Sequence, residues 1–481
     1  MNNHPAYHVS LTPHAGGRAI SRMDVEVRLG LGGKKAGERL FYLHMETVRV
    51  IPFCELVQPM EIRDALGAVP VETEEEYVNP IKRLYYKAGR DISGELVLRY
   101  TVLPRVQPEG YRSSPYFDLV CEQGGMNGSG LVFLPMAEIE GKCSFRLRWD
   151  LSDMPAGTRG VWALGEGDVS AEVSVQDILY SYYAVGVMNS LCEKNVGIYW
   201  FGSTPFPIEE TAQNVNRLVL HMAEKFEDEG LPYKIFLRAN GFPSGGGTAV
   251  FRSYMLGYSN DGNDAPSGKS LIHLFAHEMV HNWPHIEDEP YGSGNWYAEG
   301  TAQFYCSMLP YRLGMTSIDE LCREVQLNAD YLYRNPTRDM PAMEAAKLFW
   351  TDRRTQRLPY GRGFIYLANV DAEVREATGG RECLDDLCRT VLRRQRKGEK
   401  IGNEEWIGVI AAYVGEERAR REHTEMMDGT VIAPRADAFD GLLEVHEAEV
   451  TLDAMLTDEQ SIGKAETSQE KAMGWIWTVK K

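Results

Sequence analysis

The stretch that decides the fold is residues 271–305, LIHLFAHEMVHNWPHIEDEPYGSGNWYAEGTAQFY. It contains His277-Glu278-x-x-His281 and, further along, Glu299. Residues four apart lie on the same face of a helix, so the two imidazoles can point at one metal ion. Glu278 lies beside the first imidazole, where it can act as general base, and Glu299 offers a third ligand. Three protein ligands leave a fourth position open, as in catalytic rather than structural zinc sites.

The residues around this motif predict a buried helix, because apolar side chains cover one broad arc of it. Buried histidines and carboxylates need partners, and a metal ion satisfies them together. A second helix is predicted over residues 296–309, where Gly300 follows Glu299 and leaves room for another helix to approach closely. The alternative is a structural pair of hydrogen-bonded histidines with solvated glutamates.

A run of three glycines precedes the zinc motif. Gly245, Gly246 and Gly247 carry no Cβ, so another backbone can come close to them. The pattern from Thr248 to Tyr258 alternates and is rich in β-formers, which predicts a strand. An edge strand beside the zinc helix could pair with an extended peptide, so Gly245, Gly246, Gly247 and Thr248 are candidate substrate-binding residues. The alternative is a glycine loop that serves as a turn.

These motifs resemble those of the gluzincin metallopeptidases, which use two histidines and a downstream glutamate. The chain is most similar to the glycyl aminopeptidase family, and aminopeptidase N and its relatives are the next neighbours. The resemblance covers about residues 242–392. The matching segments are His277–Trp283, Trp296–Thr301, Tyr360–Gly363, Phe364–Leu367, Asp371–Arg375, Thr378–Gly380 and Leu384–Asp386. It implies a thermolysin-like catalytic domain that binds Zn²⁺ through His277, His281 and Glu299.

Tyr360 matches the tyrosine of the family's Tyr-x-Lys-Gly motif, with Arg362 in place of the lysine. The resemblance implies that this tyrosine is catalytic. A phenol can donate a hydrogen bond to the oxyanion that forms when water attacks an amide carbonyl. An apolar helical pattern follows Pro359, which predicts that Tyr360 lies near the start of a helix. The alternative is one more core aromatic among 24 tyrosines.

The sequence departs from the aminopeptidase N pattern at the residue that grips the substrate's free amine. Those relatives have a Gly-Ala-Met-Glu-Asn strand upstream of the zinc helix, whereas the glycine stretch here has no glutamate. An acidic residue from elsewhere, such as the loop 287–289, could supply the charge, or the site could accept internal peptide bonds. Exopeptidase and endopeptidase action therefore both remain open.

Composition limits the classes of partner. The chain has 481 residues, 43% of them hydrophobic, and a net charge of −18, which argues against binding nucleic acid or anionic membranes. No apolar run approaches the roughly 20 residues of a membrane span. Eight cysteines without a C-x-x-C pair and a start without a signal-like segment favour a cytoplasmic location. The sequence does not indicate an oligomeric state.

The pattern along the chain predicts a multidomain α+β protein. Residues 1–175 show short alternating segments, among them 130–135, which predict an antiparallel β-sandwich-like domain. Residues 176–421 turn mixed and then helical, as expected for a catalytic domain with a small mixed sheet lobe and a helical lobe. Strands are predicted at residues 196–201 and 233–238, with a helix over 207–226 between them. Residues 422–481 form a C-terminal tail or small subdomain. The acidic run at residues 72–76 is expected in a loop or hairpin tip.

The sequence predicts a zinc metallopeptidase of the aminopeptidase-like class that hydrolyses peptides. Two alternatives remain open: a peptide-binding pseudoenzyme that keeps zinc as a structural part, and a zinc hydrolase of a non-peptide substrate. Glu278 and Tyr360 argue against the pseudoenzyme, because binding alone requires neither residue.

Overall fold

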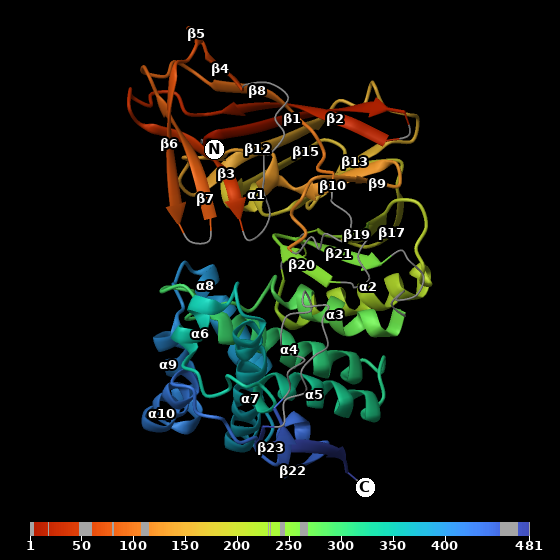
Figure 1. Cartoon of the computed structure of the whole chain (residues 1–481), viewed down its shortest axis with the longest axis vertical. Coiled ribbons are helices and arrows are strands. Elements are labelled where there is room, and N and C mark those ends of the chain that lie inside the picture. The colour runs from red at the N-terminus through yellow and green to blue at the C-terminus, as the bar shows by residue number, and fades with distance from the viewer. Residues whose placement is uncertain are drawn as a thin grey trace. The chain divides into compact units, whose positions relative to one another are not determined.

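The computed structural model describes residues 4–17, 19–47, 60–78, 81–106, 115–228, 230, 232–240, 246–259, 268–452 and 470–480. The chain divides into two compact units. The first consists of Met1–Gln213 and Gly230–Leu271, and the second of Asn214–Glu229 and Ile272–Lys481. Strands dominate the first unit and helices the second (Figure 1).

The largest sheet of the first unit has seven strands in the order β15-β12-β1-β2-β8-β4-β5. Alternate residues of β1 are buried, as expected for a strand with one face on a core. The predicted β-rich N-terminal part is confirmed, but the expectation of purely antiparallel pairing is wrong at one place, because β1 and β12 run parallel. The strands are β1 Ala6–Gly16, β2 Ala19–Leu29, β4 Glu61–Asp64, β5 Gly67–Ala68, β8 Leu96–Val102, β12 Lys142–Trp149 and β15 Val169–Ser174.

Two smaller sheets share a core with this one. Their orders are β14-β13-β16-β10-β9 and β11-β3-β7-β6. One hydrophobic cluster contains Val27 of β2, Leu43 of β3 and Val185 of β16, so the sheets pack as layers. The elements are β3 Arg39–Thr47, β6 Val71–Val78, β7 Ile81–Ala88, β9 Val120–Glu122, β10 Gly125–Ser129, β11 Met136–Ala137, β13 Arg159–Trp162, β14 Gly165–Glu166, β16 Tyr182–Gly186, the 3₁₀ helix η1 Gly130–Val132 and α1 Val175–Leu179.

Two local predictions in this unit are wrong. The acidic run at residues 72–76 belongs to β6 rather than to a loop, and it pairs with β7. Ion pairs from Lys82 to Glu75 and from Lys87 to Glu74 offset the repulsion among the glutamates. The segment 130–135, expected as a strand, begins with η1, because the Ser129 side chain caps the Leu131 amide.

The fourth sheet of the first unit has the order β17-β18-β19-β21-β20, which places β20 at its edge. The predicted strands near residues 196–201 and 233–238 and the helix between them are confirmed. The expected strand from Thr248 to Tyr258 is a hairpin instead, since Arg252 adopts a positive φ of 48° and turns the chain. The elements are β17 Asn189–Glu193, β18 Val196–Trp200, α2 Ile208–Lys225, β19 Tyr233–Asn240, β20 Gly246–Val250 and β21 Ser253–Ser259.

Helices make up most of the second unit. The predicted helices of the zinc motif and of Glu299 are confirmed as α3 and α4. The helix expected to begin at Tyr360 begins two turns earlier, because Asp352 caps it and Pro359 is accommodated inside it. The elements are α3 Gly268–Val280, α4 Asn295–Arg312, α5 Ile318–Tyr333, α6 Ala342–Leu348, α7 Arg353–Thr378, α8 Leu384–Arg396, α9 Asn403–Val414, α10 Glu416–Met427, η2 Phe439–Gly441, β22 Leu443–Thr451 and β23 Lys471–Val479.

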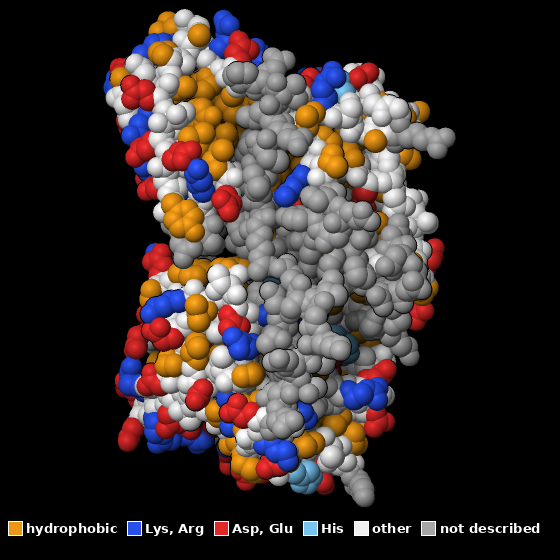
Figure 2. All heavy atoms as spheres, in the orientation of Figure 1, with side chains coloured by type: hydrophobic (Ala, Val, Ile, Leu, Met, Phe, Trp, Pro, Cys, Tyr) orange, Lys and Arg blue, Asp and Glu red, His pale blue; other side chains and the backbone are white. Residues whose placement is uncertain are grey.

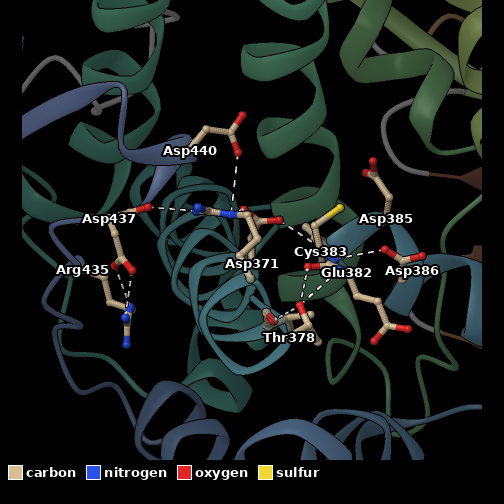
Figure 3. Close-up of polar contacts among 12 residues, drawn as sticks. Asp371, Thr378, Glu382, Cys383, Asp385, Asp386, Arg435, Asp437 and Asp440 are labelled. Atoms are coloured by element: carbon tan, nitrogen blue, oxygen red, sulfur yellow. Dashed lines mark hydrogen bonds and ion pairs between the residues drawn. The ribbon is translucent and has the colours of Figure 1, made fainter. Parts of the chain in front are cut away.

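The segment 371–386, part of the family resemblance, forms a buried polar network (Figure 3). One Asp371 oxygen accepts from the Leu384 backbone amide at 2.9 Å and the other from Arg375 Nε at 2.9 Å. Arg375 also donates to the carbonyl of Asp437. Asp371 therefore joins α7 to the start of α8 and to the segment before β22, which explains this motif by packing rather than by catalysis.

Among the residues that the structure describes, no helix is both long enough and apolar enough to cross a membrane.

Candidate metal centre

The end of helix α3 brings the two histidines of the motif together, since His277 lies in the helix and His281 directly follows its last residue, Val280. His277 and His281 are one turn apart, and their Nε2 atoms are 3.4 Å from each other. The two rings are nearly perpendicular, with centroids 5.0 Å apart. Both imidazoles therefore direct a nitrogen toward the same point, as the spacing in the sequence predicts.

Helix α4 adds Glu299 to this pair. Its Oε2 lies 3.4 Å from His277 Nε2 and 3.8 Å from His281 Nε2. The close approach expected at Gly300 is confirmed, because a Cβ there would lie 2.5 Å from the backbone of Gly363 in α7. The contact between the two glycines allows α4 and α7 to pack with their backbones adjacent, next to the carboxylate.

The donor set fits a zinc ion. In a tetrahedral site with bonds of about 2.05 Å, donor atoms lie about 3.3 Å apart, close to the three separations found here. Oε2 of Glu299 is buried and accepts no hydrogen bond from the residues that the structure describes. Such an atom is costly to bury without a partner, and a metal ion bound between the three side chains would provide one.

The electrostatics of the three residues agree with their closeness. Burial alone would raise the pKa of Glu299, but the adjacent His277 and His281 imidazoles and the Tyr360 phenol lower it overall. Burial alone would lower the pKa of His277, but Glu299 and Glu278 raise it overall. Burial lowers the pKa of His281 to about 4. His281 is thus held neutral near pH 7, which is the form that binds metal ions.

Tyr360 lies against this cluster. Its ring is parallel to that of His277 within 4°, with centroids 5.7 Å apart. Burial raises the pKa of the phenol well above its ordinary value, and the charges of Glu299 and Glu278 raise it further. The structure therefore gathers Glu278, Tyr360 and the three candidate ligands in the second unit, with the phenol protonated and able to donate.

Gln303 belongs to the site, although the sequence did not single it out. Its Oε1 lies 3.2 Å from Nδ1 of His277, and the side chain is buried. An amide oxygen accepts, so Nδ1 of His277 carries a proton and Nε2 is the nitrogen left to bind a metal ion. The signal for this contact was available, because Gln303 follows Glu299 by four residues on the same helix face.

Arg362 stands where the resembling families have a lysine. Its side chain is buried, and Nη2 donates to the carbonyls of Arg338 and Met340 at 3.0 and 2.7 Å. Burial lowers its pKa to about 10. Arg362 therefore ties α7 to the segment before α6 instead of reaching toward the ligands.

Two of the candidate substrate-binding glycines, Gly246 and Gly247, are described and lie in the first unit. Gly245 is outside the described residues. Gly246 and Gly247 begin the edge strand β20 rather than a turn. A Cβ at Gly247 would lie 2.2 Å from the Tyr254 hydroxyl, so close ring packing also requires a glycine there. The Thr248 hydroxyl accepts from the Tyr116 backbone amide at 3.0 Å and donates to the Gly247 carbonyl.

The acidic loop 287–289 is a candidate source of charge for the substrate amine. One Asp288 oxygen accepts from the backbone amides of Gly292 and Gly294, at 2.9 and 2.7 Å. Asp288 therefore organises the entry to α4, whereas the Glu289 side chain is exposed.

Comparison with known proteins identifies the class of fold. No protein-family profile matches the sequence, and no curated protein sequence is significantly similar to it. Solved structures of the M1 zinc metallopeptidase class do match, and the chain shares with them a multidomain α+β fold, a β-rich N-terminal part and a helical C-terminal region.

Three of these structures show the extent of the match. An aminopeptidase N family protein from Idiomarina loihiensis has a TM-score of 0.68 at 13% identity, over 96% of this chain and 82% of that one. An M1 zinc metallopeptidase from Deinococcus radiodurans has a TM-score of 0.54 at 14% identity, over 90% and 94%. Yeast LTA4 hydrolase has a TM-score of 0.53 at 12% identity, over 92% and 70%. At such identities the likeness establishes the fold.

Proposed function

We propose that this protein is a zinc-dependent metallopeptidase that acts on peptides, with aminopeptidase-like specificity. The observation that carries the proposal is the set of three donor atoms on His277, His281 and Glu299, which lie 3.4 to 3.8 Å apart. The likeness to M1 zinc metallopeptidases supports it, and one such structure holds a Tyr-Ser-Ala substrate.

His277, His281 and Glu299 would hold the zinc ion, and Gln303 would keep His277 in the tautomer that binds it. Zinc in such a site polarises the substrate carbonyl and activates water for attack on it. Because Glu299 and both histidines come from two packed helices, the site is held by the fold before any substrate arrives.

Glu278 and Tyr360 carry the proton chemistry in this proposal. Glu278 accepts a proton from the attacking water and delivers it to the leaving amine. Tyr360 donates a hydrogen bond to the oxyanion of the tetrahedral intermediate. The raised pKa of Tyr360 keeps the phenol protonated, as this role requires.

Within this class we propose a protein of the glycyl aminopeptidase type. The proposed domains are an N-terminal domain over residues 1–175, a thermolysin-like catalytic domain over 176–421 and a C-terminal part over 422–481. The edge strand β20 would pair with an extended peptide through its backbone, with Gly246 and Gly247 allowing a close approach.

Replacement of Glu278 by glutamine tests the proposal, since it keeps the shape of the side chain and removes the base. We expect zinc content to be retained and peptide hydrolysis to fall by about 10²-fold or more. Glu344→Gln, an exposed glutamate paired with Lys347 on α6, is the matched control and should keep full activity. A zinc-loaded wild-type protein that cleaves no member of a broad peptide library would contradict peptidase function and favour a binding protein or a non-peptide hydrolase.

A further inference from the structure

Arg357 lies one turn before Tyr360 on α7, and its guanidinium packs on the tyrosine ring. We propose that Arg357 is a positioning residue that fixes the Tyr360 phenol in the orientation required for oxyanion stabilisation. The inference rests on the proposed function, because it assigns Arg357 a role through a residue of that same site.

The contacts surround the Tyr360 ring. The Arg357 guanidinium carbon lies 4.9 Å from the centroid of Tyr360 and 5.1 Å from that of Tyr331 on α5. The two tyrosine rings are 6.2 Å apart in an edge-to-face arrangement. A cation over a ring face and an aromatic edge against it are both attractive and both depend on ring orientation. Together with the parallel His277 ring, they define the plane of Tyr360.

The close packing of helices α5 and α7 places Tyr331 beside Arg357. Helices α5 and α7 meet at Gly361, where a Cβ would lie 2.4 Å from the Leu332 amide nitrogen and 2.7 Å from the Tyr331 carbonyl carbon. Any larger residue would separate the helices and move the Tyr331 ring away from Arg357 and Tyr360. The guanidinium thus bridges two rings whose helices are in direct contact.

A fixed orientation matters because the phenol makes a directional hydrogen bond. A tyrosine that samples several orientations spends less time with its hydroxyl toward the oxyanion, and a misplaced donor loses most of its stabilising effect. Such a loss appears when the oxyanion forms rather than when the substrate binds. A change in Arg357 is therefore expected to lower kcat and to leave KM nearly unchanged.

The first test compares Arg357→Met with Arg357→Lys. Methionine keeps an unbranched chain and removes the cation, so we expect kcat to fall about tenfold at unchanged KM. Lysine restores a cation and should recover part of the loss. Zinc content and melting temperature should stay at wild-type values in both variants. Arg354→Met is the control, because Arg354 bonds to Asp352 and not to Tyr360; it should retain the wild-type kcat.

A double-mutant cycle with Tyr360→Phe separates this inference from the proposed function. Phenylalanine keeps the ring and removes the hydroxyl, so Arg357→Met should have no further effect on kcat in that background. Equal loss in both backgrounds, or loss accompanied by lower zinc content, would overturn the role of Arg357 while the peptidase proposal stands. If Tyr360→Phe alone left kcat unchanged, the proposed role of Tyr360 itself would be wrong.

Discussion

At the scale of single residues, the tautomer of His277 depends on the side-chain amide of Gln303. Gln303 Oε1 also accepts from the Cys306 thiol at 3.2 Å, so the amide oxygen is held toward Nδ1 of the imidazole from a second side. A ligand histidine whose other nitrogen has no acceptor binds metal less tightly, because its orientation and tautomer are free. Gln303 is therefore expected to contribute to metal affinity without touching the metal.

Gln303→Leu should weaken zinc binding by about 10- to 100-fold, which competition with a chelator can measure. Gln303→Glu keeps an acceptor at the same place and should retain zinc affinity near the wild-type value. Unaltered affinity in the leucine variant would show that Gln303 supports packing alone.

The residues of the site differ in how far the sequence could predict them. His277, Glu278 and His281 share one helix turn, so the spacing alone placed them together. Tyr360 was found through the family resemblance, and the structure brings it beside His277. The metal and catalytic roles of these residues remain predictions. Arg357 was missed because its role depends on Tyr331 from another helix, which no local spacing reveals.

At the scale of elements, the site depends on the crossing of α4 and α7. A Cβ at Gly363 would lie 1.9 Å from the Trp296 carbonyl oxygen and 2.9 Å from the Gly300 Cα. These are backbone atoms and cannot move away as a flexible side chain could. The two helices also carry Glu299 and Tyr360, so their separation sets the distance between a ligand and the phenol.

Gly363→Ala is expected to lower the free energy of unfolding by about 1–3 kcal/mol, because the added methyl overpacks the crossing. The same variant should lose zinc and activity, since Glu299 moves with α4. Gly408→Ala on α9 is the control: its added Cβ would have no heavy atom within 4 Å apart from the adjacent residues and the nearby backbone of its own helix, and alanine should stabilise that helix by about 0.5–1 kcal/mol. Urea unfolding of both variants measures the difference, and equal stability of the two would contradict this account.

Elements with a clear period were predicted well, and those that depend on distant partners were not. Helix α3 follows from the broad apolar arc of its sequence, and α4 is buried on nearly every side. The strand β6 was missed because its glutamates are stabilised by Lys82 and Lys87 of the neighbouring strand, and local composition does not show that pairing. The sequence pattern predicts one strand where the structure has the hairpin of β20 and β21. The turn is hidden because an arginine, Arg252, occupies the positive-φ position that usually holds glycine or asparagine.

At the scale of the whole molecule, the net charge is −18. On the face that Figure 2 draws, red acidic and blue basic side chains of the described residues are interspersed. The acidic excess is therefore not gathered in one patch on this face. A net negative field of this kind attracts cations over long distances and weakens with added salt. Peptides with a free ammonium group should therefore be captured faster than neutral ones.

Recognition of the substrate's amino terminus distinguishes an aminopeptidase from an endopeptidase. An aminopeptidase must hold the ammonium group near the scissile bond, and a buried charge without a partner is costly, so a carboxylate is required close to it. The glycine stretch supplies none, and Asp288 has one oxygen engaged by backbone amides. We expect the protein, if it acts as the peptidase proposed above, to prefer free amino termini but to be less strict than aminopeptidase N relatives. A short peptide and its N-acetylated form should differ in kcat/KM by about tenfold or more, and the difference should shrink as ionic strength rises. Equal rates, with products of internal cleavage identified by mass spectrometry, would make the protein an endopeptidase and leave the zinc chemistry untouched.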